Sequence, residues 1–324
     1  MTGNLQAAGE WRGVHVLTPN AQAAEAAIAQ APALAALGVN LLIVELDYFY
    51  AYTSHPELSE PNPVTHEQAR RLVRSCQEHG IRLIPQFNCL GHQSWAEQTY
   101  ALLRQYPEFD ETPGQYPNNA GIYCRSWCPR QEALLPIVFD LFDELIDTFE
   151  ADALHVGMDE VFVIASEHCP RCKGMDPVRL YAQAVGDYYN YLLKRGVEML
   201  IWGDRFLDDQ IMGYGEWEAD RLHIHPAVDR VAKDIIICDW HYELRSSYPS
   251  IPFFLEKGFR VLPSGWRDER AVEALVDYAQ AQGSERMLGY LATTWNGVKP
   301  EDVAAWSPIT IAMRKLVDVT SARM

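Results

Sequence analysis

The hydrophobic residues of this chain occur in short continuous runs, separated by longer stretches whose apolar residues follow a helical period. Short apolar runs without alternation are typical of strands buried on both faces, as in parallel sheets. We therefore predict eight strands, at Val14–Leu17, Asn40–Leu46, Ile81–Phe87, Ala153–Gly157, Glu198–Trp202, Asp234–Trp240, Phe259–Pro263 and Met287–Thr293.

A helical pattern follows each predicted strand. These patterns cover residues 21–37, 65–79, 131–149, 177–195, 249–257, 268–282 and 303–316, with a shorter one after the fifth strand. Three of the helices end at a glycine (Gly38, Gly80 and Gly196), as helices with a left-handed C-cap do. Strands that alternate with helices require right-handed crossovers, and eight such units favour a closed (β/α)8 TIM barrel. An open doubly wound sheet is the alternative, but no glycine-rich phosphate loop follows the first strand.

The length of 324 residues suits one α/β barrel, and no repeat or linker divides the chain, so we predict a single catalytic domain over residues 1–324. The formal charge is −17, which disfavours nucleic acids and anionic membranes and suits a small neutral substrate. The first residues resemble no secretion signal, no apolar run could span a bilayer, and the seven cysteines are an odd number. We expect a cytoplasmic protein, for which a homodimer is one compatible state.

Polar and aromatic residues collect where the predicted strands end, and in barrels of this class the active site lies at those ends. Among them are four tryptophans, each at the end of a different strand: Trp202, Trp240, Trp266 and Trp295. A single such tryptophan could belong to the core. Four at equivalent places indicate an aromatic-walled pocket, and pyranose rings present apolar faces that aromatic rings bury well.

Adjacent carboxylates, Asp159 and Glu160, end the fourth strand. Neighbouring strand residues point to opposite faces, so both can serve one site only where the strand breaks, and Gly157 gives the backbone that freedom. Two close carboxylates can divide the roles of proton donor and stabilising anion. Taken alone, however, the pair would favour a solvated loop, which is common in an acidic protein.

Three segments resemble a known family. Leu154–Val161 is similar to the His-x-Gly-x-Asp-Glu signature of glycoside hydrolase family 20, the β-N-acetylhexosaminidases. Ile84–His92 resembles the family's Ile-Pro segment that ends in Gly-His, and Gly38–Asp47 resembles the second strand of the hexosaminidase D-like branch. The resemblance extends over nearly the whole chain.

The resemblance implies an exo-acting enzyme that removes terminal β-linked GlcNAc or GalNAc and retains the anomeric configuration. In this family the acetamido oxygen of the substrate attacks the anomeric carbon and forms an oxazolinium intermediate. Asp159 would orient the acetamido group, and Glu160 would protonate the leaving oxygen and then deprotonate water. No metal or other cofactor is implied for catalysis.

Further roles are also implied by the resemblance. Arg12 would bind sugar hydroxyls, although a salt bridge at the bottom of the barrel is an equal alternative for it. His92 would position the catalytic pair, and His155 would support it from outside the pocket. The remaining expected substrate contacts are the pocket walls Trp202, Trp240, Trp266 and Trp295, together with the polar groups of Asp204 and Tyr242.

Two departures from the family pattern stand out. The last strand reads Trp295-Asn296, where the family often has a glutamate that binds sugar hydroxyls, so the preference between GlcNAc and GalNAc is open. The chain also starts almost at its first strand, which predicts a barrel without a preceding α+β domain.

Four cysteines form a separate pattern. Cys169 and Cys172 follow the catalytic pair, and Cys124 and Cys128 lie in the long segment after the third strand. Together they could form a tetrahedral zinc site that joins two loops, although free thiols or a disulfide remain alternatives.

Two other functions are compatible with the sequence. A barrel that has lost turnover could bind an amino sugar without hydrolysing it. A different glycosidase could instead use two separated carboxylates, such as Glu45 or Asp47 with Glu160, and would accept sugars without an acetamido group.

Overall fold

The computed structural model describes residues 11–322. The first ten residues, in which we expected no secretion signal, lie outside the described residues. Eight parallel strands form a closed barrel in the order β1-β10-β9-β8-β7-β6-β3-β2. β1 closes the ring by pairing with both β2 and β10. The predicted (β/α)8 barrel is therefore confirmed. Its strands are β1 (Trp11–Leu17), β2 (Leu41–Glu45), β3 (Arg82–Cys89), β6 (Ala153–Gly157), β7 (Glu198–Trp202), β8 (Ile236–Trp240), β9 (Arg260–Gly265) and β10 (Gly289–Thr293).

The helices lie close to the predicted positions. Gly38, Gly80 and Gly196 have φ angles of +92°, +68° and +70°, the left-handed conformation expected after a helix. The helices are α1 (Ala21–Ala36), α2 (His66–Glu78), α3 (Ala101–Gln105), α4 (Leu134–Phe149), α5 (Pro177–Arg195), α6 (Asp209–Met212), α7 (Ser250–Glu256), α8 (Glu269–Ala281) and α9 (Ser307–Ala322). The last helix begins later than predicted, because Pro300–Ala305 forms a 3₁₀ turn instead.

Side chains fill the interior of the barrel rather than leaving a channel. Leu41, Ile43, Ile84, Leu200 and Leu262 form one buried cluster there, which Trp11 and Trp202 join. A second, larger cluster lies between the strands and the surrounding helices. Because the interior is packed, a substrate can enter only above the strand ends.

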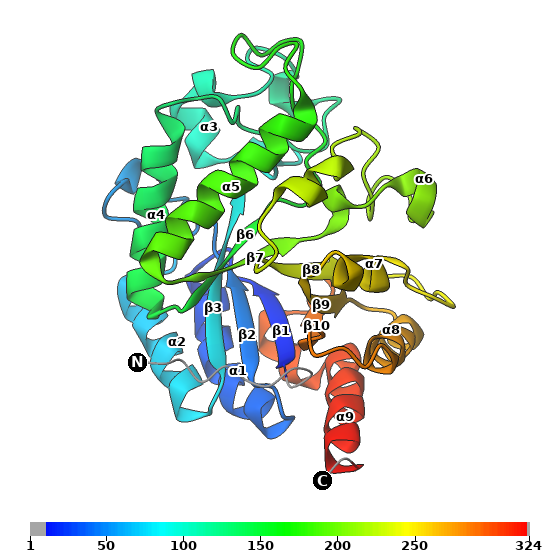
Figure 1. Cartoon of the computed structure of the whole chain (residues 1–324). Coiled ribbons are helices and arrows are strands. Elements are labelled where there is room, and N and C mark those ends of the chain that lie inside the picture. The colour runs from blue at the N-terminus through cyan, green and yellow to red at the C-terminus, as the bar shows by residue number, and fades with distance from the viewer. Residues whose placement is uncertain (1–10, 323–324) are drawn as a thin grey trace.

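Long connections follow four of the strands, β2, β3, β6 and β7, at their carboxyl ends. The segment after β3 contains α3 and a two-stranded ribbon, β4 (Ser94–Trp95) and β5 (Gln98–Thr99), neither of which was predicted. Figure 1 shows α3 and the upper part of α5 beyond the barrel, on the side opposite α9. These connections form the walls around the strand ends.

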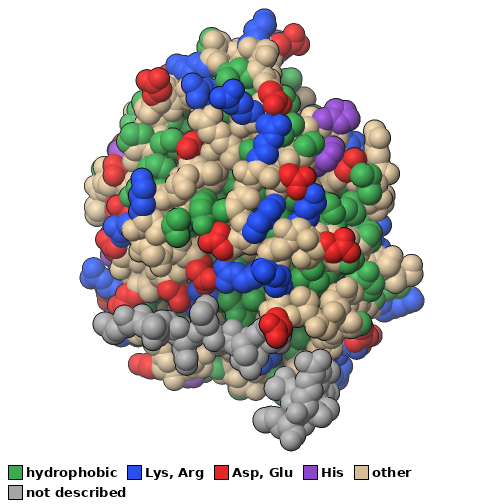
Figure 2. All heavy atoms as spheres, in the orientation of Figure 1, with side chains coloured by type: hydrophobic (Ala, Val, Ile, Leu, Met, Phe, Trp, Pro, Cys, Tyr) green, Lys and Arg blue, Asp and Glu red, His purple; other side chains and the backbone are tan. Residues whose placement is uncertain are grey.

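The surface in Figure 2 carries Lys and Arg side chains interspersed with Asp and Glu side chains. Over residues 11–322, no helix combines the length and apolar character that crossing a membrane requires.

Candidate active site

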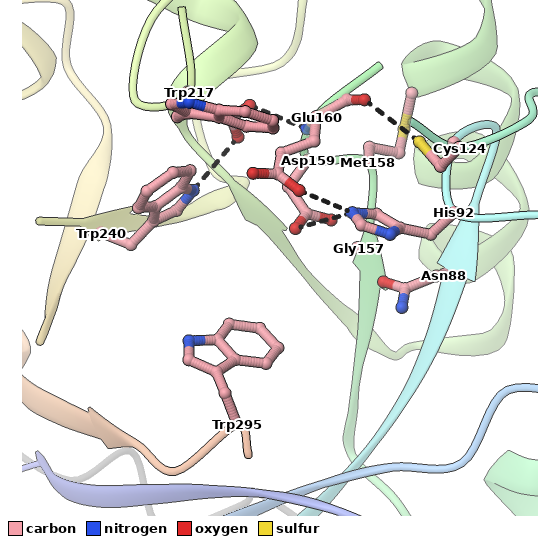
Figure 3. Close-up of polar contacts among 12 residues, drawn as sticks. Asn88, His92, Cys124, Gly157, Met158, Asp159, Glu160, Trp217, Trp240 and Trp295 are labelled. Carbon is pink, nitrogen blue, oxygen red and sulfur yellow. Dashed lines mark hydrogen bonds and ion pairs between the residues drawn. The ribbon is translucent and has the colours of Figure 1, made fainter. Parts of the chain in front are cut away.

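A pocket of about 500 Å³ opens at the carboxyl ends of the barrel strands. Asp159 and Glu160 both line it, so the structure brings the predicted catalytic pair into one cavity (Figure 3). Of the other predicted substrate contacts, His92, Trp240, Tyr242, Trp266 and Trp295 also line the pocket.

The backbone after β6 explains how adjacent carboxylates reach the same space. Gly157, Met158 and Glu160 have φ angles of +65°, +68° and +47°, so the alternation of a strand stops here. A Cβ atom on Gly157 would lie 2.0 Å from the Oδ1 of Asn88, which no side chain tolerates. Glycine is therefore needed at this position both for its φ angle and for the close approach of β3.

His92 lies between the two carboxylates. Its Nε2 is 3.3 Å from the Oδ2 of Asp159 and 3.3 Å from the Oε2 of Glu160. Burial opposes the charged ring, but the charge of Asp159 and hydrogen bonding with both carboxylates outweigh it, so the pKa of His92 is raised well above its ordinary value. The raised pKa favours the charged form of the His92 ring beside these two carboxyl groups.

Asp204 supports the pair from behind and does not line the pocket. Its Oδ2 accepts hydrogen bonds from the backbone N–H of Glu160 (2.9 Å) and from the Nε of Arg205 (2.6 Å). Its Oδ1 accepts from the Nε1 of Trp240 at 3.3 Å. The expectation that Asp204 contacts substrate is therefore corrected: it holds the backbone of Glu160 and the ring of Trp240 in place.

The aromatic walls contact one another. Tyr242 stacks on Trp240 with ring centroids 4.9 Å apart, and its hydroxyl accepts a hydrogen bond of 2.6 Å from the Nε1 of Trp295. Trp266 meets Tyr242 edge-on at 5.4 Å. Trp202 is fully buried in the barrel, 5.7 Å from Trp295, and does not reach the pocket. The side chain of Trp202, at the end of β7, points into the packed interior of the barrel. Trp202 therefore packs beneath Trp295 and does not form part of the pocket wall.

His155 does not line the pocket and contacts Trp202 and the turn after β6. Its ring lies 4.5 Å from that of Trp202, and its Nδ1 accepts a hydrogen bond of 3.0 Å from the backbone N–H of Gly157. Burial lowers the pKa of His155 well below its ordinary value, so the ring is neutral and can accept this bond.

Three polar residues at the ends of β2 and β3 were seen in the sequence but not assigned to the substrate. Glu45, Asp47 and Asn88 all line the pocket. The amide of Asn88 donates to the Oε1 of Glu45 (3.0 Å) and to the Oδ2 of Asp47 (3.1 Å). Burial first, and then the charge of Glu45, raise the pKa of Asp47 to about 8. Their place at the carboxyl ends of two neighbouring strands was a signal that could have identified them.

An aromatic rim at the mouth of the pocket was missed. Trp95, Tyr123 and Trp217 are each at least one-third exposed, and their rings form a row with centroids 5.7 and 4.9 Å apart. These residues come from the long connections after β3 and β7, where no strand end marks them in the sequence. We name Trp95, Tyr123 and Trp217 the aromatic rim.

Residues 20–265 match the description "Glycosyl hydrolase family 20, catalytic domain", and they make up well over half of the chain. The chain belongs to glycosyl hydrolase family 20. This confirms the family resemblance inferred from the Asp-Glu and Gly-His segments.

Individual relatives agree with the family 20 assignment. A β-hexosaminidase of Akkermansia muciniphila is 31% identical over 112 residues, which are 34% of this chain and 22% of that protein. The Flavobacterium johnsoniae chitobiase superposes with a TM-score of 0.66 at 21% identity, over 97% of this chain and 51% of that one. A solved β-N-acetylhexosaminidase gives 0.70 at 18% identity, over 95% and 72%. The chain thus spans about half the length of the chitobiase, and the structural likeness shows the fold.

One residue expected to bind sugar in this family 20 chain lies elsewhere. Arg12 is near the start of β1, at the end of the barrel opposite the pocket, where its side chain donates to the carbonyl of Gly38. Its backbone N–H donates to Asn40. Of the two alternatives for Arg12, the structure therefore favours the one at the bottom of the barrel over sugar binding, because the first residues of a barrel strand lie at that face. Asn296, which stands where the family often has glutamate, does line the pocket.

The four cysteines suggested as one zinc site do not converge. The Sγ of Cys124 lies 3.6 Å from the carbonyl oxygen of Glu160, to which it donates. Cys128, Cys169 and Cys172 instead gather around Glu111, with ligand atoms within 4.8 Å of one another. Glu111 comes from an earlier part of the long segment after β3. Its distance from the cysteines in the sequence does not indicate that it lies beside them.

Proposed function

We propose that this chain is an exo-acting β-N-acetylhexosaminidase that uses the acetamido group of its substrate as nucleophile. The observation that carries the proposal is that adjacent carboxylates, Asp159 and Glu160, face one aromatic-walled pocket with His92 3.3 Å from each. A pocket that ends on the packed top of the barrel suits a terminal sugar. The family membership supports the same reaction.

In the proposed reaction, Asp159 accepts the N–H of the acetamido group and turns its carbonyl oxygen toward the anomeric carbon. The Oδ1 of Asp159 is buried and has no hydrogen-bond partner among the described residues, as this role requires. Attack by the carbonyl oxygen breaks the glycosidic bond while Glu160 gives its proton to the leaving oxygen. Glu160 then takes a proton from water, which opens the oxazolinium ring and restores the sugar with its configuration retained.

The pocket walls would hold the sugar in this position. Trp240, Tyr242 and Trp295 offer apolar surface to the acetamido methyl and the ring faces. Glu45, Asp47 and Asn296 would bind the sugar hydroxyls in place of Arg12. The aromatic rim would contact the leaving group outside the cavity.

A glycosidase with two separated carboxylates fits the geometry less well. Both oxygens of Glu45 already accept hydrogen bonds, from Asn88 and from Gln86 and His15. With a pKa of about 8, Asp47 is largely protonated at neutral pH and is a poor nucleophile.

The direct test compares aryl N-acetyl-β-glucosaminide and N-acetyl-β-galactosaminide with the plain β-glucoside and β-galactoside. We expect turnover of the acetamido substrates alone. Glu160→Gln should lower kcat by about 10²–10⁴ for poor leaving groups, a typical effect of losing a general acid, and Asp159→Asn should also impair it severely. Glu167→Gln, an exposed carboxylate in the same loop, is the matched control and should keep full activity.

Three results would refute the proposal. The first is near-normal turnover in both site variants. The second is equal hydrolysis of plain glucosides, which would favour separated carboxylates. The third is tight binding of an oxazoline-mimicking thiazoline without hydrolysis of any substrate, which would favour a binding protein.

A further inference from the structure

Three thiols and a carboxylate meet below the surface of the two loops that border the pocket. Cys128 and Glu111 belong to the excursion after β3, and Cys169 and Cys172 belong to the loop between β6 and α5. The ligand atoms of all four lie within 4.8 Å of one another. All four side chains are fully buried, so this is not an exposed acidic cluster.

Glu111 lacks the partners that a buried carboxylate needs. Its Oε1 receives the backbone N–H of Ser166 at 2.9 Å and the thiol of Cys172 at 2.7 Å. Its Oε2 is buried and has no hydrogen-bond partner among the described residues. Among the described residues, no Lys or Arg forms an ion pair with Glu111, and the three thiols are its neighbours. A buried charge of this kind is costly unless a cation balances it.

We propose that Cys128, Cys169, Cys172 and Glu111 bind a structural zinc ion. Thiolate sulfur and carboxylate oxygen are both zinc ligands, and four protein ligands make the closed tetrahedral site typical of structural zinc. Binding would release the thiol protons to solvent as the sulfurs coordinate the ion. The two-residue spacing between Cys169 and Cys172 is the one that zinc-binding turns use.

The number of groups to be satisfied favours zinc over a disulfide. Cys169 and Cys172 lie in a tight turn in which the N–H of Lys173 donates to the carbonyl of Cys169 at 3.2 Å. A disulfide could join only two of the three sulfurs and would leave the third thiol and the Glu111 carboxylate buried together. One zinc ion satisfies all four groups.

The site would fix the mouth of the pocket. Phe162, in the loop that follows Glu160, packs edge-on against Tyr123 of the aromatic rim at 5.5 Å. Cys128 lies close in sequence to Tyr123, and Cys169 lies in the loop that continues from Phe162. An ion that joins these two loops would hold the rim in place without touching the substrate, so the proposal goes beyond the proposed glycosidase function.

The test measures zinc in the full-length chain, purified without a polyhistidine tag or chelator. We expect one zinc ion per chain by elemental analysis, with a shell of three sulfurs at about 2.3 Å in X-ray absorption spectra. Cys172→Ser should lose the metal, and Glu111→Gln should release it faster to a chelator. Removal of zinc from the wild type should lower Tm by about 5 °C or more.

Three control variants locate the ion. Cys76→Ala changes a buried thiol in α2 and should keep the zinc. Cys124→Ser separates this site from the four-cysteine alternative and should also keep it. Glu160→Gln should keep zinc while losing turnover. This result would distinguish the proposed site from one at His92, Asp159 and Glu160. It also allows the zinc proposal and the proposed function to fail separately.

The spectra of the wild type decide the matter even if Cys172→Ser fails to fold. A chain without zinc, a disulfide between two of the three cysteines by mass spectrometry, or a metal bound only through nitrogen and oxygen would each overturn the proposal.

Discussion

Asp47, His92, Glu160 and Trp295 all line the pocket and all have positive φ angles, between 38° and 54°. Residues other than glycine rarely adopt this conformation, which costs roughly 1–2 kcal/mol each. Each lies just beyond the end of a barrel strand, where the chain must turn sharply to aim a side chain back over the barrel. The strain is therefore concentrated where the side chains must converge.

Gly157 provides the sharpest residue-scale prediction. In Gly157→Ala, the new Cβ would meet the Oδ1 and Cα of Asn88 at 2.0 and 2.9 Å, so β3 or the turn that carries Asp159 must move. We expect a loss of several kcal/mol in the free energy of unfolding and a drop of at least about 100-fold in kcat, because small displacements of catalytic groups are costly.

Gly80→Ala is the matched control for this change. Gly80 has nearly the same φ angle, +68° against +65°, but nothing lies within 4 Å of a Cβ built on it. Its cost should be only the roughly 1–2 kcal/mol of the left-handed conformation, with activity intact. Equal losses in the two variants, measured by urea unfolding and aryl-substrate kinetics, would show that the contact with Asn88 is unimportant.

At the scale of elements, Arg205 holds the connection between β7 and β8. The buried guanidinium pairs with Asp204, and its Nη2 donates to the carbonyls of Glu216 and Trp217 at 2.8 Å each and of Ala219 at 3.1 Å. One side chain thus ties the residue behind Glu160 to the segment that carries part of the aromatic rim.

Arg205→Lys keeps the charge but removes the planar fork of donors, so it should free the carbonyls of residues 216–219. We expect a loss of about 2 kcal/mol or more, faster hydrogen exchange in residues 213–222, and lower kcat because Asp204 is less well fixed. Arg221→Lys is the control, since Arg221 pairs with Asp209 at 2.7 Å but is more than half exposed. Its effect should stay below about 1 kcal/mol. Similar effects of both variants on stability and exchange would contradict this role.

Long periodic elements could be predicted from the sequence, whereas short elements and contacts between loops could not. The strands were predictable because each is a short apolar run between helices, and β6 and β7 have the predicted bounds. The β4–β5 ribbon and α3 were not, because they are too short to show a period. Contacts between loops could not be predicted either. The fold of the long segment after β3 brings Glu111 to three of the cysteines and places Cys124 beside Glu160 instead.

Position within an element decided the other errors. Arg12 was assigned to the site by its resemblance to a family arginine, yet its place before the apolar run of β1 puts it at the bottom of the barrel. Trp202 ends β7 with its ring directed inward, so that it supports Trp295 rather than the substrate. The outcome for Arg12 follows from its place in the strand, whereas that for Trp202 follows from the direction of its side chain, which spacing along the sequence does not reveal.

For the whole molecule, the site concentrates acidic groups that burial keeps partly protonated. Burial and then Glu45 raise the pKa of Asp47 to about 8. Burial raises that of Asp204 to about 6, against the opposing charge of Arg205. These shifts arise mainly from the burial of carboxyl groups in and behind the pocket, and they make the stability of the barrel depend on pH.

Asp47 makes the barrel less stable as pH rises. An unfolded aspartate loses its proton near pH 4, whereas folded Asp47 keeps it to about pH 8. Between these values the folded chain binds more protons than the unfolded chain, so stability falls as pH rises.

We expect the free energy of unfolding, from urea titrations at pH 5, 6, 7 and 8, to fall more steeply for the wild type than for Asp47→Asn. The difference in slope should be at most about 1.4 kcal/mol per pH unit. The exposed Asp302→Asn should follow the wild type. Parallel curves for the wild type and Asp47→Asn would contradict this prediction. They would mean that Asp47 is already ionised in the folded barrel at pH 5.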